Sequence, residues 1–254
     1  MDDLTGRTVL VTGASKGIGQ ATVVALGTAG ANVIAHYGSD EAGARAAVSG
    51  IAPNRRLVLQ ADLAAPGETR RLWNEALGGK GHVDVLVNNA AVLIETPLDD
   101  SDDAWAEKWA RTWDVNVRSA ADLMRDAVRH FQARGGGVLV GLSSWVAQRG
   151  SGNPDLLAYS ASKGAIKGFV HTIARNHAKD GVLAYLIAPG VVRTQMSVDA
   201  AARQGGEAKL TASLAMGEWV PPAEIGELIV FLATGRQRHL TGATFDVNGA
   251  SYIR

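Results

Sequence analysis

Seven short apolar runs recur along the chain, and each of them is rich in Val, Ile and Leu. The apolar residues are continuous rather than alternating with polar ones, which is typical of strands that are buried on both faces of a parallel sheet. These runs therefore predict seven buried strands, at residues 8–13, 32–37, 56–62, 83–90, 137–144, 183–190 and 243–249.

Stretches with the apolar spacing of amphipathic helices separate these runs. They lie at residues 17–29, 40–50, 67–78, 101–134, 158–179 and 222–234. Strand and helix alternate from end to end, which predicts a single α/β domain over residues 1–254, with a doubly wound, parallel seven-stranded sheet of the Rossmann type and helices on both faces. The one long segment without a strand is 194–221, and we expect it to form a lid over the substrate.

Composition narrows the classes of function. The 254 residues include 25 basic and 25 acidic ones, and this zero formal charge argues against a nucleic-acid-binding protein. The absence of cysteine excludes disulfides and thiolate metal sites, and the six histidines show no metal-binding spacing, so we expect no metal. The first residues lack the pattern of a signal peptide, and polar residues interrupt the longest uncharged run, 17–39. We therefore expect a cytoplasmic protein without membrane contact.

The first predicted strand leads into the glycine-rich stretch TGASKGIG at residues 12–19, and a predicted helix follows it. Glycines at this place let the backbone approach a pyrophosphate, which the free N–H groups of the helix start then bind. The spacing is GxxxGxG rather than GxGxxG, and a glycine cluster alone can also mark a tight turn. The strand before it and the helix after it favour nucleotide binding.

The stretch YSASK places Tyr159 and Lys163 four residues apart at the start of a predicted helix, so the two side chains share a face. A free tyrosine, with a pKa of about 10, gives up its proton reluctantly. A nearby ammonium stabilises the phenolate and brings the pKa closer to the pH at which general acid–base catalysis works best. So short a motif also arises by chance, and its meaning depends on the rest of the chain.

Six segments occur in the order seen in the short-chain dehydrogenase/reductase family. They are TGASKGIG at 12–19, NNAA at 88–91, DVNV around residue 116, SS at 143–144, YSASK at 159–163 and PGVVRT at 189–194. Nearly the whole chain resembles this family, and it is similar to the 3-oxoacyl-[acyl-carrier-protein] reductase-like members. The resemblance implies an oxidoreductase that interconverts a carbonyl and a secondary alcohol with a nicotinamide cofactor.

The resemblance also implies a catalytic tetrad of Asn116, Ser144, Tyr159 and Lys163. Tyr159 would be the proton donor in reduction, Lys163 would lower its pKa and bind the ribose, and Ser144 would hydrogen-bond to the substrate oxygen. The amide of Asn116 would hold a water that relays protons to Lys163. Ser143 is expected to be a turn residue. The spacing from Ser144 to Tyr159 is two residues longer than in close relatives, so the stretch QRGSGNPDLL carries an insertion.

By the same resemblance, the nicotinamide cofactor would contact residues at the ends of most strands. Asp62 would touch the adenine, and the segment from Pro189 to Thr194 would wrap the nicotinamide. The expected cofactor-binding residues are Gly13, Ser15, Lys16, Gly17, Ile18, Gly19, Tyr37, Ser39, Asp62, Leu63, Asn89, Ala90, Tyr159, Lys163, Pro189, Gly190, Val192 and Thr194.

The end of the second strand bears on the choice of cofactor. NAD enzymes of this architecture place an acid about 20 residues beyond the glycine motif, where it binds the ribose 2′-hydroxyl. Here the position is Tyr37, and Lys16 in the glycine loop can supply a positive charge to a 2′-phosphate. We expect a preference for NADP(H), while Asp40 and Glu41 nearby leave NAD(H) possible.

Two readings compete with an NADP(H)-dependent enzyme: an NAD-dependent alcohol or polyol dehydrogenase, and an inactive nucleotide-sensing or scaffold protein of the same fold. The presence of all four tetrad residues favours an enzyme. The substrate stays open between a small ketone, a sugar or polyol, and a 3-oxoacyl group. The resemblance further implies a homotetramer, in which Trp105, Trp109 and Trp113, one stripe on the 101–134 helix, would supply contacts.

Overall fold

The computed structural model describes residues 3–203 and 205–254, and within them it contains one parallel sheet of seven strands. The order across the sheet is β3-β2-β1-β4-β5-β6-β7, which confirms the predicted doubly wound fold. The strands are β1 (Thr8–Val11), β2 (Asn32–Tyr37), β3 (Arg56–Gln60), β4 (Val85–Asn88), β5 (Gly137–Leu142), β6 (Val182–Pro189) and β7 (Thr244–Val247).

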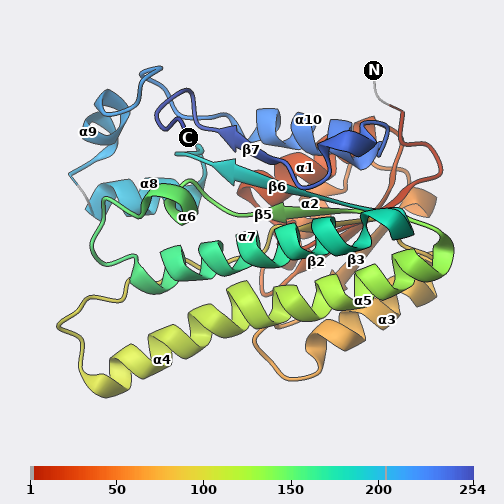
Figure 1. Ribbon diagram of the computed structural model, residues 1–254, viewed down its shortest axis with the longest axis horizontal. Helices are drawn as coiled ribbons and strands as arrows, with labels where there is room; N and C mark the ends of the chain where they lie inside the picture. The colour runs from red at the N-terminus through yellow and green to blue at the C-terminus, as the bar shows by residue number, and fades with distance from the viewer. Residues whose placement is uncertain (1–2, 204) are drawn as a thin grey trace.

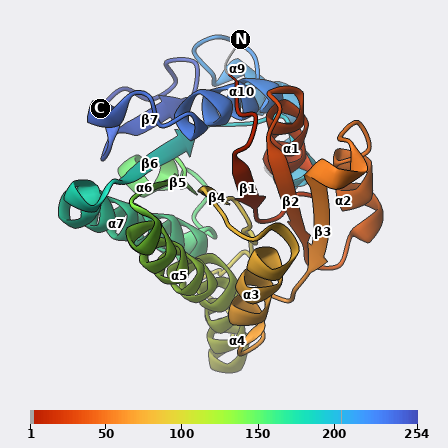
Figure 2. The same cartoon turned by 90° about the vertical axis from the view of Figure 1, so that its right-hand side faces the viewer.

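Helices cover both faces of the sheet, as Figure 2 shows in a view along its edge. One face packs against α1 (Gly17–Thr28), α2 (Glu41–Ala47) and α10 (Pro222–Ala233). The other packs against α3 (Glu68–Lys80), α5 (Ser119–Arg134) and α7 (Leu157–His177). Short 3-10 turns lie at Pro53–Arg55, Ala178–Asp180 and Arg238–Leu240.

The predicted 101–134 helix is continuous but not uniform. It consists of α4 (Asp102–Trp113), a π-helical turn η2 (Asp114–Arg118) and α5. Ser101 begins it by accepting a hydrogen bond from the backbone N–H of Ala104, and the acids Asp102 and Asp103 in the first turn complement the helix dipole. The α4 part extends past the sheet, along the lower edge of the molecule in Figure 1.

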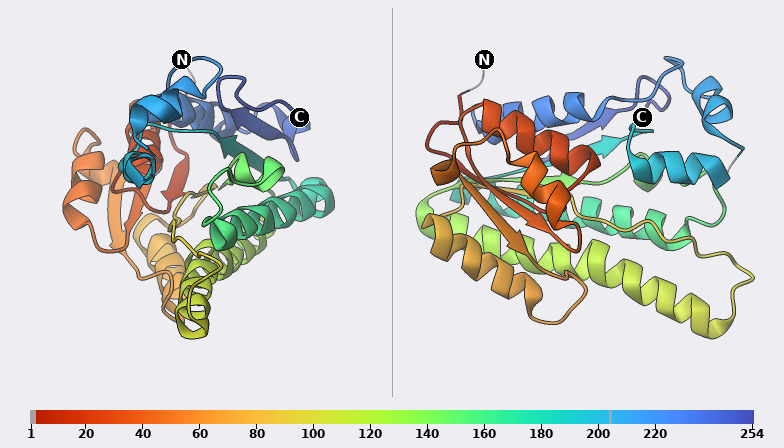
Figure 3. Two further views of the ribbon diagram at one scale, coloured as in Figure 1. Left: turned by 90° about the vertical axis from the view of Figure 1, so that its left-hand side faces the viewer. Right: turned by 180° about the vertical axis from the view of Figure 1, so that it is seen from behind.

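The predicted lid segment 194–221 contains α8 (Gln195–Arg203) and α9 (Glu207–Ala212), while residue 204 lies outside the described residues. It has a small apolar cluster separate from the main core, formed by Ala201, Leu214 and Trp219 against Trp145, Val191, Val198 and Leu210. Together with α6 (Val146–Arg149), these helices gather beyond the carboxyl ends of the strands, at the left of Figure 1. The right-hand view of Figure 3 shows α8 and α9 at the same end of the molecule from behind.

The strand order creates a switch point between β1 and β4. From β1 the chain proceeds outward to β2 and β3, and it then returns to place β4 on the other side of β1. Loops that follow β1 and β4 therefore diverge, and in open α/β sheets ligands bind in the crevice that results.

Candidate active site

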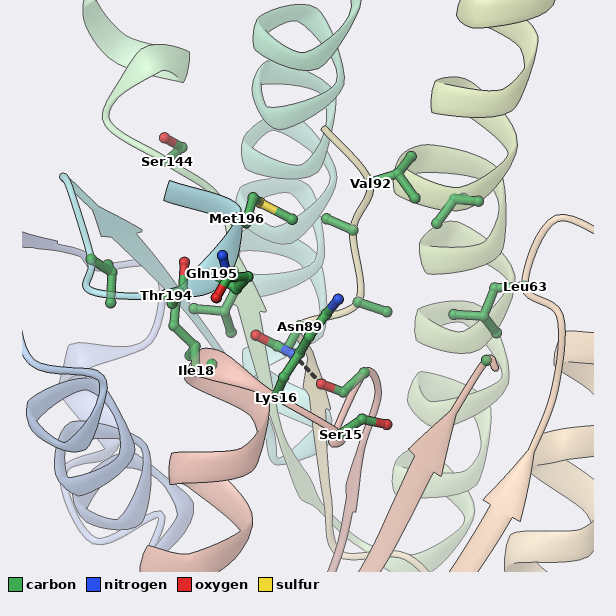
Figure 4. A pocket seen from close by; sticks show the side chains of 18 of the residues that line it. Ser15, Lys16, Ile18, Leu63, Asn89, Val92, Ser144, Thr194, Gln195 and Met196 are labelled. Carbon is green, nitrogen blue, oxygen red and sulfur yellow. Dashed lines mark hydrogen bonds between the residues drawn. The ribbon is translucent and has the colours of Figure 1, made fainter. Parts of the chain in front are cut away.

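A cavity of about 390 Å³ occupies this crevice, at the carboxyl ends of the strands. Figure 4 shows Ser144 and Met196 toward one end of it, and Ser15 and Lys16 toward the other. Most of the residues predicted for catalysis or cofactor binding line it: Gly13, Ser15, Lys16, Gly17, Ile18, Ser39, Asp62, Leu63, Asn89, Ala90, Ser144, Tyr159, Lys163, Pro189, Gly190, Val192 and Thr194. Three do not line it: Gly19, Tyr37 and Asn116.

The glycine loop fits a pyrophosphate. Gly13 and Gly17 have φ values of +68° and +57°, a conformation that favours glycine. A Cβ on Gly19 would lie 2.0 Å from the carbonyl oxygen of Gly13, so this glycine allows the close packing of loop against helix rather than contact with the cavity. No side chain caps the N-terminus of α1, whose first amides therefore stay available to an anion.

Asn89, after β4, holds the glycine loop in place. Its Nδ2 donates to the carbonyl oxygens of Thr12, at 2.9 Å, and Gly13, at 3.1 Å. In return, Thr12 Oγ1 accepts from the backbone amides of Asn89 and Ala90, both at 3.0 Å. The loops that diverge from β1 and β4 are thereby joined at the switch point.

His36 lines the cavity and was not expected there from the sequence. Its buried ring lies between two strand ends, where Nδ1 accepts from the Gly13 N–H at 3.1 Å and Nε2 lies 3.0 Å from the carbonyl oxygen of Ala61. Since Gly13 donates and Ala61 accepts, the ring hydrogen is on Nε2. Burial lowers the pKa of His36 to about 4, so the ring is neutral near pH 7. The sequence held one indication of this position: His36 directly precedes Tyr37 in the strand, so the two side chains must point to opposite faces.

Tyr37, expected at the ribose, points elsewhere. Its side chain contacts Glu41, and burial together with the Glu41 carboxylate raises the pKa of its phenol. His36 lines the cavity instead, because successive side chains of a strand point to opposite faces. Gly38, Ser39 and Asp40, which follow β2, line it as well.

Charges of both signs lie at this end of the cavity. Lys16 lines it, as expected, but so does Asp40, whose carboxylate caps α2 by accepting from the Gly43 N–H at 2.8 Å. The Asp40 carbonyl accepts from Ser15 Oγ at 2.7 Å, which ties the start of α2 to the glycine loop. Asp40 is therefore held beside the cavity.

Arg111 also lines the cavity and was not expected there. It projects from α4, and its Nη2 lies 3.5 Å from Oδ1 of Asp62, the residue expected at the adenine. Both side chains are about half exposed. No local signal indicated it, since Val115, the cavity-lining residue four positions further on, was not expected at the site either.

Ser144, Tyr159 and Lys163 meet at the other end of the cavity. Ser144 follows β5, and Tyr159 is the third residue of α7, with Lys163 one turn further on. Lys163 is 5% exposed, and its Nζ lies 5.6 Å from the centroid of the Tyr159 ring and donates to the Leu142 carbonyl at 3.0 Å. Ser143 Oγ donates to the Lys163 carbonyl at 2.9 Å and so joins β5 to α7.

Burial governs the charges of the Tyr159 and Lys163 pair. It raises the pKa of Tyr159 to about 12, against the opposing effect of a hydrogen bond with Ser144, and it lowers the pKa of Lys163 to about 8. The expected lowering of the Tyr159 pKa is therefore not seen in the protein alone. Desolvation penalises the phenolate by more than the hydrogen bond stabilises it.

Asn116 lies in the π-helical turn, and its side-chain amide makes hydrogen bonds to other residues of the protein. Oδ1 accepts from the Val92 N–H at 2.8 Å, while Nδ2 donates to the Val92 carbonyl at 2.9 Å and to Ser162 Oγ at 3.0 Å. Ser162 Oγ in turn donates to the Tyr159 carbonyl at 2.7 Å. Both amide hydrogens are used within the chain, so the side chain positions the loop after β4.

In the described part of the chain, no group of three or more His, Asp or Glu side chains is placed to hold a metal ion. None of the helices in the same residues combines the length and the apolar character needed to cross a membrane.

Comparison with known proteins agrees with this geometry. A family model described as enoyl-(acyl carrier protein) reductase matches residues 13–250. The chain is 34% identical to 3beta-hydroxysteroid dehydrogenase 1 of Eggerthella lenta, over 98% of this chain and 94% of that protein. It is 31% identical to a 3-oxoacyl-[acyl-carrier-protein] reductase of Synechocystis sp., over 98% of both.

A solved structure shows the same fold. The crystal structure of a 3-ketoacyl-(acyl-carrier-protein) reductase from Brucella melitensis, complexed with NADH, superposes with a TM-score of 0.87 at 27% identity. The match covers 99% of this chain and all of the other. Fold and site together define an oxidoreductase built on a nucleotide-binding sheet. The chain belongs to the short-chain dehydrogenase/reductase family.

Proposed function

We propose that this protein interconverts a carbonyl and a secondary alcohol by hydride transfer, with NADP(H) as the preferred cofactor. The substrate is a small ketone, a sugar or polyol, or a 3-oxoacyl group. The observation that carries the proposal is the convergence of Ser144, Tyr159 and Lys163 on the cavity that the glycine loop also lines. An inactive scaffold protein would have no need to keep these three side chains together.

The residues around the cavity fit a nicotinamide dinucleotide. The amides at the start of α1 would bind the pyrophosphate, Asp62 the adenine, and the segment from Pro189 to Thr194 the nicotinamide. When bound, the cofactor supplies or accepts the hydride. The structurally similar reductase of Brucella melitensis was crystallised in complex with such a cofactor, NADH.

Tyr159 is the acid in the reduction. Its pKa of about 12 keeps the phenol protonated near pH 7, so the hydroxyl has a proton to give to the carbonyl oxygen of the substrate. Ser144 donates a hydrogen bond to the same oxygen and stabilises the negative charge that develops on it. In the oxidation Tyr159 acts as the base, and the ammonium of Lys163 and the hydroxyl of Ser144 then stabilise the phenolate.

Replacement of Tyr159 by Phe tests this function. We expect turnover of ketones with NADPH to fall by about 10² to 10⁴, the usual effect of removing a general acid. Binding of NADPH, followed by its fluorescence, should persist. The assay uses a panel of ketones, sugars and 3-oxoacyl thioesters with both cofactors, and Tyr37→Phe is the matched control because Tyr37 lies outside the cavity. Turnover of Tyr159→Phe within tenfold of the wild type would refute the assignment.

We also propose that the segment 194–221 is the substrate lid. Its residues Gln195, Met196 and Ser197 line the cavity, and Arg203 of α8 makes an ion pair of 2.9 Å with Glu95 in the loop after β4. This pair joins two segments on opposite sides of the cavity mouth. The amide of Gln195, the thioether of Met196 and the hydroxyl of Ser197 would thus contact the substrate.

A homotetramer is the last part of the proposal. Trp105, Trp109 and Trp113 stack along α4, with ring centroids 5.6 and 6.4 Å apart, and Trp113 is 40% exposed. The same four-residue spacing continues to Val117 and Ala121, which line a groove of about 630 Å³ between α5 and α7. Phe169 and Ile173 form its other wall. A second copy of the chain would bury the exposed face of Trp113 and this groove.

A further inference from the structure

Thr96 is a fully buried polar residue that the proposed reaction does not use. It lies in the loop between β4 and α4 and makes three hydrogen bonds to the segment that precedes Tyr159. Its backbone N–H donates to the carbonyl oxygen of Asp155 at 2.6 Å, and its Oγ1 donates to the same oxygen at 3.2 Å. The same Oγ1 accepts from the backbone N–H of Ala158 at 3.2 Å.

The bond from Ala158 makes Thr96 the cap of α7. This helix begins at Leu157, and the residue at its N-cap position is Leu156, whose side chain has no hydrogen-bonding group. A Ser or Thr at that position would normally accept from one of the first amides of the helix. Thr96 fulfils the same role from 62 residues away in sequence. The capped residue directly precedes Tyr159.

The capped segment is also the one in which we expect a two-residue insertion. Within it, Ser151 Oγ accepts from the Asn153 N–H and Asn153 Oδ1 accepts from the Asp155 N–H, both at 3.0 Å. These bonds fold the segment into consecutive turns that end at Asp155, where Thr96 binds it. Since no side chain at the N-cap position of α7 caps the helix, the contact with Thr96, outside the segment, fixes where α7 begins.

The loop that carries Thr96 is itself anchored at two points. Asn116 binds both backbone groups of Val92, and Glu95 makes its ion pair with Arg203 of the lid. Figure 1 shows this loop reaching the start of α7 from below. One loop thus connects the π-helical turn, the lid and the helix of Tyr159.

We propose that Thr96 is a positioning residue for Tyr159, which fixes the start of α7 and with it the place of the phenol relative to Ser144. This inference rests on the proposed function. Without the hydroxyl, the buried Ala158 amide has lost its acceptor, and the first turn of α7 moves to find another. A displacement of about 1 Å at a reacting group can cost about 10² in rate.

The test compares Thr96→Val, which removes the hydroxyl at similar volume, with Thr96→Ser, which keeps it. The matched control is Thr234→Val. Thr234 is likewise buried, and its Oγ1 likewise donates to a carbonyl, that of Phe231, and accepts from an amide, that of Arg236. It follows α10, outside the cavity. For each variant, kcat, the KM values, the dissociation constant of NADPH and the melting temperature are measured.

We expect Thr96→Val to lower kcat by about 10-fold to 100-fold, while the dissociation constant of NADPH stays within about twofold. Thr96→Ser should recover kcat to within about threefold of the wild type. Thr234→Val should keep kcat within about twofold of the wild type, even if its melting temperature falls as far as that of Thr96→Val. Equal losses of kcat in Thr96→Val and Thr234→Val at equal melting temperature overturn the proposal, as does a serine variant no better than valine. Should Thr96→Val fail to fold, Thr96→Ala takes its place.

A spectroscopic measurement separates this inference from the proposed function. The chain has four tyrosines, so the NMR signal of a ¹³C-labelled Tyr159 ring is assigned by its loss in Tyr159→Phe. This signal should shift in Thr96→Val, return in Thr96→Ser and stay unchanged in Thr234→Val. A wild type without turnover on any substrate refutes the proposed function alone, whereas an unmoved Tyr159 signal in Thr96→Val refutes the positioning role.

Discussion

The charge states of single residues in this site are set first by burial. Tyr159, Lys163 and His36 are all shifted toward their neutral forms by desolvation. For Tyr159 this suits a proton donor, and for His36 it preserves the lone pair that accepts from the Gly13 amide. Of the three shifts, that of His36 is the one that acid opposes.

His36 should make the protein less stable as the pH falls. Its pKa is lowered from 6.5 to about 4 by folding, so its contribution to stability is complete above pH 6.5 and is lost as the pH falls toward 4. One pKa unit corresponds to about 1.4 kcal/mol, which gives a loss of about 3 kcal/mol in the free energy of unfolding. Urea unfolding between pH 7.5 and 4.5 measures it.

The variant His36→Asn provides the comparison, because asparagine keeps an acceptor for Gly13 and has no charge to gain. Other histidines and the carboxyl groups titrate equally in both proteins, so the difference between the two curves isolates His36. Parallel curves would show that protonation of His36 does not limit stability.

Lys16 and Asp40 should act in opposite directions on the choice of cofactor. We expect the wild type to prefer NADPH by at least about tenfold, or about 1.4 kcal/mol. Lys16→Ala should raise the KM for NADPH at least about tenfold and change that for NADH by less than about twofold, since only NADPH has the 2′-phosphate. Asp40→Asn removes a negative charge yet keeps a good helix cap, so it should increase the preference for NADPH. Steady-state kinetics with both cofactors checks these values, and equal effects of Lys16→Ala on the two would contradict them.

At the scale of elements, the site depends on how loops and helix ends approach one another. The glycine loop packs on α1 through Gly19, and the helix of Tyr159 is tied to its neighbours by Asn116, Ser162 and Thr96. These contacts join elements that are far apart in the chain. A change at one of them should therefore affect binding or catalysis without a change in the cavity lining.

Gly19→Ala tests the packing of the glycine loop. The added Cβ would lie 2.0 Å from the Gly13 carbonyl oxygen and 2.6 Å from Asn89 Nδ2, so loop and helix must separate. We expect cofactor binding, measured by calorimetry, to weaken at least about tenfold. Gly78→Ala in α3 is the control, since nothing lies within 4 Å of its added Cβ. That change should raise the free energy of unfolding by about 0.5–1 kcal/mol. Unchanged cofactor affinity in Gly19→Ala would show that the loop adapts.

At the scale of the whole molecule, the exposed apolar stripe of α4, α5 and α7 should hold subunits together. Light scattering of the wild type should give a mass of four times 26.5 kDa, about 106 kDa. Phe169→Glu places a charge in the groove and should yield smaller species. Leu98→Glu should not, because Leu98 is 83% exposed and lies outside the groove. A wild-type species of 26.5 kDa at micromolar concentration would rule out the tetramer.

Sequence reasoning placed the elements well but extended several strands too far. The predicted runs 8–13, 56–62 and 137–144 end beyond β1, β3 and β5, because the first residue after each strand, Thr12, Ala61 or Ser143, is still buried. Those extra residues include Gly13, Asp62 and Ser144, which line the cavity. An apolar run does not distinguish the last paired residue of a strand from the first buried residue of the site.

The sequence by itself determined the doubly wound sheet, the glycine loop and the Tyr159–Lys163 pair, because periodicity and short spacings are local properties of the chain. Only the tertiary structure decided that His36 rather than Tyr37 faces the cavity, that Arg111 meets Asp62, and that Thr96 caps the helix of Tyr159. It also decided the direction of the Tyr159 pKa shift. Contacts between distant segments and the loss of water around a side chain exist only once the chain has folded, and no local pattern records them.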